Sequence, residues 1–391
     1  MPLRQILSER EEELEKLEMQ KLLRVATESK NIISLGPGEP DFGPPKQVVA
    51  ELKRAVQKGY SRYSAVEGRK ELLEQVAKKL RKENKISTDT ENIVVTSGSN
   101  EAIMLSLMCV VDPGEQVMVP DPGYVTYIPT VELLNGQAIS IPLLDRKNFE
   151  PTIESLKWLL KEPKRTRAII LNTPSNPTGR TYSRKVLEEI ADFAVQHNLL
   201  VISDEAYEKF VYNKSKHISI GSFNGMQDYV VTVHSFSKTF GMPGFRVGYA
   251  SGPKKVIDAM RKLHLYASIC APTISQIAAT KALKVGTGFL KKIVKEYDRR
   301  RKLVVKRIKG IDSLSMVEPN GAFYAFVKYQ NIHKSSLKLC RKILEEYKLA
   351  LVPGSDFGRY GEGYFRISYA TSRPLLEKGL DRLEKAFKKM K

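Results

Sequence analysis

The sequence predicts an α/β protein with a doubly wound, mostly parallel sheet and a smaller α+β domain. Between residues 46 and 285, short β-branched runs alternate with amphipathic helical patterns, which is the order expected of a parallel sheet with crossover helices. Several of these runs end in clusters of Gly, Pro, Asn and Asp, at the edge where doubly wound sheets bind ligands. A long basic helical pattern over residues 289–308 then begins a second unit with its own strands and helices.

The length of 391 residues allows two domains. We expect a large domain over residues 46–288, and a small domain that residues 1–45 form together with residues 289–391. Residues 8–29 have the pattern of a charged amphipathic helix rather than of a signal peptide, and no apolar run is long enough to cross a membrane. We therefore expect a cytoplasmic protein with no membrane partner.

The chain is strongly basic, with 64 Lys and Arg against 44 Asp and Glu and a formal net charge of +20. Basic runs such as residues 299–302 lie on amphipathic helical patterns, which is typical of a solvated helix face. No nucleic-acid module is recognisable, so we expect no nucleic-acid partner, and a basic RNA-binding protein stays the non-enzymatic alternative. The three cysteines are far apart and form no Cys-x-x-Cys pair, so we expect no metal site.

Lys238 is the strongest catalytic candidate in the sequence. It follows a buried strand pattern over residues 229–233. Hydroxyl residues stand beside it at Ser235 and Ser237, and Arg246 follows eight residues later. A lysine ammonium changes its pKa readily when partly desolvated, hydroxyls donate to phosphate oxygens, and a guanidinium grips phosphate through two parallel bonds. These residues suit an imine-forming lysine beside a bound phosphate, and the cofactor that they suggest is pyridoxal 5′-phosphate.

A turn at residues 97–100 is a second candidate for binding phosphate. A strand pattern over residues 92–96 precedes the turn, and a helical pattern over residues 101–111 follows it. Free backbone N–H groups at the start of a helix point towards an anion, so this arrangement suits a phosphate. The turn lacks the Walker and dinucleotide-binding motifs, and on its own Ser-Gly-Ser is equally a plain helix N-cap.

Two charged residues interrupt apolar strand patterns. Asp204 ends the strand pattern of residues 199–203, at the edge where ligands of parallel sheets bind. Arg366 lies inside the apolar pattern of residues 364–369, and a guanidinium is costly to bury without a partner. We therefore expect an anion to meet Arg366.

These motifs together resemble the fold type I, PLP-dependent aminotransferases of class I and II, the aspartate, aromatic, alanine and kynurenine group. The resemblance runs from about Ile33 to the C-terminus. It is carried by the lysine region from Ser235 to Tyr249, by Asn-Pro-Thr-Gly at residues 176–179, by Asp204 with Tyr207, and by Phe-Arg-Ile-Ser-Tyr at residues 365–369. The resemblance implies the PLP-dependent transferase fold and an active site between the two domains.

The resemblance also implies a role for each site residue. Lys238 would hold the cofactor as an imine and act as the proton carrier. Asp204 would pair with the pyridine nitrogen, and because it lies beside that cation its pKa is expected to be depressed. The remaining cofactor contacts would come from Ser99, Asn100, Tyr124, which stacks on the ring, Asn176, Tyr207, Ser235, Ser237 and Arg246. The substrate carboxylate would be bound by Gly38, Asn176 and Arg366.

Tyr63 is the one candidate that the resemblance assigns to another subunit's site. It lies in an aromatic-then-glycine segment, residues 60–68, whose family counterpart reaches the cofactor phosphate of the neighbouring chain. A packed loop tyrosine is the alternative interpretation. The family role predicts a homodimer with shared active sites.

The expected activity is transfer of an amino group from an L-amino acid to a 2-oxo acid, with 2-oxoglutarate as the acceptor. Aspartate-selective relatives commonly place a second arginine at the distal carboxylate, and residues 265–272 contain none. This absence favours broad or aromatic specificity. An aspartate or alanine aminotransferase and a same-fold PLP-dependent C–S lyase are the alternatives.

Overall fold

The computed structural model describes residue 8, residues 21, 22, 24, 25 and 29, and residues 31–390. Most of the helix expected over residues 8–29 therefore lies outside the described residues. None of the described helices is both long and apolar enough to cross a membrane.

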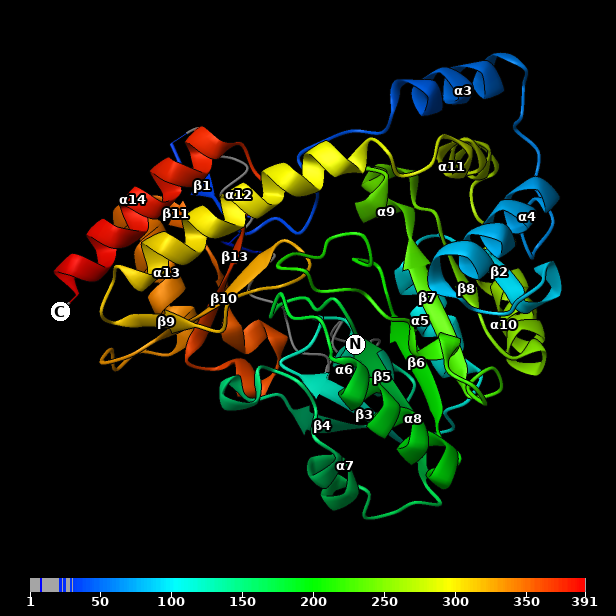
Figure 1. Cartoon of the computed structure of the whole chain (residues 1–391), viewed down its shortest axis with the longest axis horizontal. Coiled ribbons are helices and arrows are strands. Elements are labelled where there is room, and N and C mark those ends of the chain that lie inside the picture. The colour runs from blue at the N-terminus through cyan, green and yellow to red at the C-terminus, as the bar shows by residue number, and fades with distance from the viewer. Residues whose placement is uncertain (1–7, 9–20, 23, 26–28, 30, 391) are drawn as a thin grey trace, which may run out of the picture.

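A seven-stranded sheet forms the centre of the larger part of the molecule, in the order β2-β8-β7-β6-β5-β3-β4 (Figure 1). All pairings are parallel except those of β8, which runs antiparallel to both β2 and β7. The strands are β2 (Ile93–Thr96), β3 (Gln116–Asp121), β4 (Gln137–Pro142), β5 (Thr166–Asn172), β6 (Leu200–Asp204), β7 (Val230–Ser235) and β8 (Gly248–Ser251). Buried β-branched and aliphatic residues dominate them, as expected of strands covered on both faces.

Helices cover both faces of this sheet. One face packs against α4, α7, α8 and α11, and the other against α5, α6 and α10. The bounds are α3 (Lys46–Gln57), α4 (Lys70–Lys79), α5 (Ser99–Met108), α6 (Tyr127–Leu133), α7 (Ile153–Leu159), α8 (Arg184–His197), α9 (Phe236–Thr239), α10 (Lys254–Ala267) and α11 (Thr273–Val285). Neighbouring strand residues alternate between the two cores, for example Ile169 and Ile170, because successive strand side chains point to opposite faces.

A four-stranded antiparallel sheet, in the order β12-β13-β10-β9, centres the smaller part. Its strands are β9 (Leu314–Met316), β10 (Tyr324–Tyr329), β12 (Val352–Pro353) and β13 (Tyr364–Ser368). The helices beside it are α12 (Leu290–Lys309), α13 (Ser336–Tyr347) and α14 (Arg373–Lys389). The N-terminal strand β1 (Ile33–Ser34) joins this part by parallel pairing with β11 (Leu349–Ala350).

The predicted α/β fold is confirmed, and three details differ from the sequence analysis. The helix after the turn at residues 97–100 begins at Ser99 rather than at residue 101, so residues of the turn cap the helix. Strand β4 was not identified, because its residues are mostly half exposed and give no clear alternation. The apolar pattern of residues 321–327 also predicts a strand, which in the structure begins only at Tyr324.

Candidate active site

One cavity of about 480 Å³ collects nearly all the predicted site residues at the carboxyl ends of β5, β6 and β7. The four-stranded sheet contributes its far wall through β10 and β13. Twelve predicted residues line it: Gly38, Ser99, Asn100, Tyr124, Asn176, Asp204, Tyr207, Ser235, Ser237, Lys238, Arg246 and Arg366. Of the predicted residues, Tyr63 alone does not.

Lys238 lies in the short helix α9, directly after β7. Ser235 caps this helix, with its Oγ accepting a hydrogen bond from the backbone N–H of Ser237 at 3.1 Å. The Lys238 Nζ donates to the carbonyl oxygen of Gly38 at 2.7 Å. Burial lowers the pKa of Lys238 to about 8, against the opposing field of Glu39. A larger fraction of this side chain is therefore the neutral, nucleophilic amine than in an exposed lysine at the same pH.

Asp204 is a buried carboxylate with hydrogen-bond donors but without a cation. Its Oδ2 accepts from the Tyr127 hydroxyl at 2.7 Å, and its Oδ1 accepts from the backbone N–H of Ala206 at 3.1 Å. In the described part of the chain no lysine, arginine or histidine forms an ion pair with it. Burial consequently raises the pKa of Asp204, although Tyr127 and Lys238 act to lower it. The depressed pKa expected for Asp204 assumed a pyridinium cation beside it, so it stays a prediction for the cofactor-bound protein.

The Tyr207 hydroxyl lies 2.8 Å from the Tyr324 hydroxyl, and both rings are buried. Tyr324 also donates to the Gly38 carbonyl at 3.2 Å, so β10, the N-terminal loop and the end of β6 meet here. A Cβ on Gly38 would stand 2.9 Å from the Tyr324 hydroxyl. Glycine is therefore needed at position 38 to let the loop approach the cavity so closely.

Arg366 is buried in β13, and no carboxylate of the described residues forms an ion pair with it. Its Nη1 donates to the Asn176 side-chain oxygen at 2.7 Å, and its Nη2 donates to the Gly36 carbonyl. Its Nε has no hydrogen-bond partner within the described residues. The guanidinium carbon lies 4.5 Å from the centre of the Tyr324 ring, and burial lowers the pKa of Arg366. The predicted anion is thus not supplied by the described chain, which leaves this cation for a ligand.

At the N-terminus of α5, which lines the cavity, free backbone N–H groups lie close to the guanidinium of Arg246. Gly98 has a φ of 88°, and a Cβ there would collide with the Arg246 guanidinium. Arg246 itself is exposed, and its Nη2 donates to the Ser97 carbonyl at 3.4 Å. Glu101 ties the turn down by accepting from the Ser97 backbone N–H and from the Ser268 hydroxyl. A helix N-terminus facing an arginine is a ready site for a phosphate.

The two remaining predicted residues differ in their setting. Tyr124 lines the cavity, with its ring edge-on to Tyr127 at 5.5 Å, and its hydroxyl lies 3.5 Å from the Asn100 amide nitrogen. Tyr63 is 78% exposed and stands outside the cavity. The Asn176–Pro177 peptide bond is cis.

The sequence analysis missed several residues of the cavity and its second layer. Asn172, Glu39 and Tyr324 line the cavity, and Tyr127 binds Asp204 from behind. Asn172 was within the Asn-rich segment after β5, where its polar end-of-strand position was a usable signal. The two tyrosines had no such signal, because a tyrosine in an apolar pattern is normally core.

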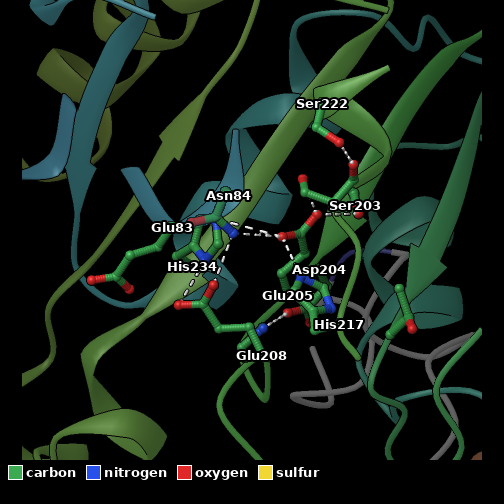
Figure 2. Close-up of polar contacts among 12 residues, drawn as sticks. Glu83, Asn84, Ser203, Asp204, Glu205, Glu208, His217, Ser222 and His234 are labelled. Atoms are coloured by element: carbon green, nitrogen blue, oxygen red, sulfur yellow. Dashed lines mark hydrogen bonds and ion pairs between the residues drawn. The ribbon is translucent and has the colours of Figure 1, made fainter. Parts of the chain in front are cut away.

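A buried ionic cluster lies on the opposite side of the same strand ends, at residues 205 and 208 of the turn after β6 (Figure 2). Glu205 accepts hydrogen bonds from Ser219 at 2.6 Å, His217 at 2.8 Å and Ser203 at 3.1 Å. Glu208 forms an ion pair with Lys79, and the Asn84 amide bridges the two glutamates. We call this set, with His234, the buried ionic cluster.

The fold and the cavity together place a buried lysine amine among cationic and backbone N–H groups that suit an anionic ligand. The family comparison agrees, since residues 30–383 match the model of the family described as aminotransferase class I and II. The chain belongs to this family.

Named relatives and a solved structure extend this finding. The chain is 43% identical to an aspartate aminotransferase of Pyrococcus abyssi, over 96% of each chain. It is 42% identical to aromatic-amino-acid aminotransferase 2 of Thermococcus litoralis, over 98% of this chain and 99% of the relative. The crystal structure of an aromatic aminotransferase from Pyrococcus horikoshii covers 95% of this chain with a TM-score of 0.89 and 41% identity. The predictions of an enzyme, of the fold type I architecture and of amino-group transfer are confirmed.

Proposed function

We propose that the protein is a pyridoxal 5′-phosphate-dependent aminotransferase that acts on aromatic or a broad range of L-amino acids, with 2-oxoglutarate as the acceptor. One observation carries the proposal: the amine of Lys238, with its pKa lowered to about 8, shares a cavity with an unpaired carboxylate and an unpaired guanidinium. The family itself supports the reaction type.

The residues of the cavity fit this cofactor. Asp204 is a buried anion that lacks a cation, which suits a protonated pyridine nitrogen. The α5 N-terminus, Ser235, Ser237 and Arg246 surround a place for the phosphate. Asn176 and Tyr207 offer an amide and a hydroxyl for the phenolic oxygen, and Tyr124 offers a ring face. When bound, the cofactor supplies an electron sink that stabilises negative charge at the substrate Cα.

The chain's own residues then divide the remaining work. The Lys238 Nζ would hold the cofactor and would accept and carry the proton that leaves the substrate Cα. Asp204 would keep the pyridine nitrogen protonated. Arg366, held by Asn176 and Gly36, binds the substrate carboxylate through a planar pair of N–H groups, and the Gly38 backbone adds a further contact.

The preference for aromatic or varied substrates rests on the charges around the cavity. Apart from Lys238, Arg246 and Arg366, no basic residue of the described chain lines it, and the exposed carboxylate of Glu39 does. A second carboxylate on the substrate would therefore lack a cation and meet a like charge. Relatives named for aspartate and for aromatic amino acids are both similar to this chain, so substrate measurements must decide.

The test is a steady-state panel of L-amino acids with 2-oxoglutarate, comparing kcat/KM for phenylalanine, tyrosine, aspartate and alanine. We expect the aromatic donors to exceed aspartate by at least about tenfold, which corresponds to roughly 1.4 kcal/mol. Glu39→Gln should raise kcat/KM for aspartate and leave phenylalanine nearly unchanged. A higher value for aspartate in the unmodified enzyme contradicts the specificity proposal, and release of ammonia and sulfide from cysteine without oxo-acid consumption would indicate the lyase instead.

We further propose that the working unit is a cytoplasmic homodimer whose active sites are completed by Tyr63 of the partner chain. Tyr63 and Tyr266 are each 78% exposed. Tyr266 lies in the last turn of α10, and Thr273 at the start of α11 donates a hydrogen bond from its hydroxyl to the Arg62 carbonyl, beside Tyr63. Large exposed aromatic residues are typical of an interface.

A mixture of Lys238→Ala and Tyr63→Phe chains tests the shared site. If Tyr63 acts across the interface, a heterodimer has one site with both changes and one with neither, so half of its sites bind cofactor as tightly as the unmodified enzyme. If every site that carries Lys238 keeps the Tyr63→Phe defect, the contact lies within one chain. A monomer in analytical ultracentrifugation would contradict the dimer as a whole.

A further inference from the structure

A second cavity, of about 430 Å³, lies behind the turn that carries Lys238. Its wall includes Phe236 and Thr239 of α9 and Phe240, the residue that follows this helix. The C-terminal ends of α4 and α11 also line the cavity. Ala206 and Ser235 line both this cavity and the candidate active site, so a single layer of chain separates the two. The volume is within the range of small-molecule pockets.

Three lysines at this cavity have no ionic partner. Lys78 and Lys82 stand one helical turn apart on α4 and its π-helical extension (Leu80–Asn84), and Lys284 stands at the end of α11. All three are exposed, and none forms an ion pair or a side-chain hydrogen bond within the described residues. Lysines that converge on a concave surface create a positive potential that attracts anions.

The inner wall of the cavity is formed by the buried ionic cluster, in which Glu208 is paired with a lysine and Glu205 accepts several hydrogen bonds (Figure 2). Lys79 lies between Glu208 and the Asn84 side chain, and Lys209 pairs with Glu83. Glu205, Glu208 and His234 have the spacing of a metal site, but the Lys79 ammonium already binds Glu208, so a metal would have to displace it. The lining as a whole contains five lysines and three glutamates, so the three exposed lysines leave an excess of positive charge.

His234 adds a buried polar group without a partner. It is 3% exposed and lines the cavity, and its Nε2 has no hydrogen-bond partner among the described residues. The nearest carboxylate oxygens are 3.8 and 3.9 Å from its ring nitrogens, beyond hydrogen-bond distance. Buried polar groups are almost always hydrogen-bonded, so an unpartnered one in a cavity indicates a missing ligand atom or water.

We propose that this cavity is a second ligand site, which takes a small organic or inorganic anion with at least two negative groups, either carboxylates or phosphates. The ligand would also contact Gly286 and Thr287, which connect α11 to α12 and hence the seven-stranded part to the four-stranded part. It therefore touches both the turn that carries Lys238 and the connection between the two parts of the molecule. The proposal does not depend on which amino acid the enzyme uses.

Isothermal titration calorimetry of the holoenzyme with citrate and, separately, with inorganic pyrophosphate tests the site and distinguishes the two chemical sources. The test variant is the triple substitution Lys78→Ala, Lys82→Ala and Lys284→Ala. A matched control removes the same charge from exposed lysines outside the lining of this cavity: Lys157→Ala, Lys338→Ala and Lys378→Ala. Binding of either probe at the candidate active site is unchanged in both variants, so the difference between them reports the second cavity.

We expect at least one probe to bind with one additional site per chain, at least tenfold more weakly in the test variant and within twofold of the unmodified enzyme in the control. Lys284→Glu alone should weaken binding in the same direction, which guards against misfolding of the triple variant. Equal affinity in the test and control variants overturns the proposal. So does the absence of a second binding event for both probes up to 10-fold above the concentration that saturates the first.

Discussion

Residues 204–208 form one turn with two unlike sides. Asp204 and Tyr207 face the candidate active site, whereas Glu205 and Glu208 face the buried ionic cluster. On the cluster side each carboxylate is matched by a cation or by several donors. On the active-site side Asp204 lacks a cation. Charges that the chain leaves unbalanced are the ones available to ligands, and charges that it balances stabilise the scaffold.

The largest test of this contrast between the two sides of the turn is a substitution of Lys238. Lys238→Ala should lower kcat by up to about 10⁴-fold, since it removes the group that moves the proton. The free energy of unfolding should change little, because only one hydrogen bond to Gly38 is lost. Amino-transfer assays and urea unfolding measure the two effects, with Lys157→Ala as the control. Activity above about a tenth of the unmodified enzyme would show that another group carries the proton.

A substitution in the buried ionic cluster should have the opposite effect, a large change in the free energy of unfolding. Glu208→Ala leaves the Lys79 ammonium buried without a counter-charge, which should cost about 3–5 kcal/mol of the free energy of unfolding. The double substitution Lys79→Met and Glu208→Leu removes both charges and should cost much less. Urea unfolding of the three variants measures this. Equal losses for the single and double variants would mean that the pair matters for packing alone.

A substitution of Arg366 tests whether this unpaired guanidinium binds every substrate. Arg366→Lys should raise KM for all amino donors by roughly 10- to 100-fold, the scale of one hydrogen bond to a charged group, because an ammonium cannot reproduce the planar pair of donors. KM for phenylalanine and aspartate should rise by similar factors. An increase confined to one of them would place Arg366 at the substrate side chain.

The smallest effect is expected from Asp204→Asn in cofactor-free protein. Burial raises the pKa of Asp204, so the folded state binds more protons than the unfolded state above the unfolded pKa, and stability falls as the pH rises through that window. Removing the charge should therefore stabilise the apo protein at pH 7, by at most about 1 kcal/mol. The gain should disappear at a pH low enough to protonate Asp204. Destabilisation of the apo protein at pH 7 would show that the chain balances this charge itself.

Residue type alone did not separate the two sides of the turn. Asp204 and Glu205 are adjacent carboxylates, and the first was singled out by its position at the strand end together with the family resemblance. Arg366 could be identified from physical reasoning, because a charge in an apolar strand demands a partner. Tyr127 and Tyr324 could not, since each is an ordinary apolar-pattern residue that meets the site only through tertiary contacts with Asp204 and Tyr207.

The chain's connectivity explains what else the sequence could not reveal. The alternation of strands and helices predicted the parallel sheet, but the antiparallel place of β8 between β2 and β7 depends on long-range pairing. The lysine cluster around the second cavity comes from α4 and α11, two helices distant in the sequence, and the basic composition gave no hint that three charges converge there.

The pairing of β1 with β11 has a consequence for the birth of the protein on the ribosome. Ile33 can pair with Leu349 only after that residue has been synthesised. At a synthesis rate of about 5–20 residues per second, the interval between the two residues is roughly 15 to 60 s. The loop after β1 supplies the carbonyls of Gly36 and Gly38 that receive Arg366 and Lys238. A nascent chain can therefore complete the seven-stranded sheet before the wall of the candidate active site is complete. A chain that is truncated before Leu349 would form the sheet without a complete active-site cavity.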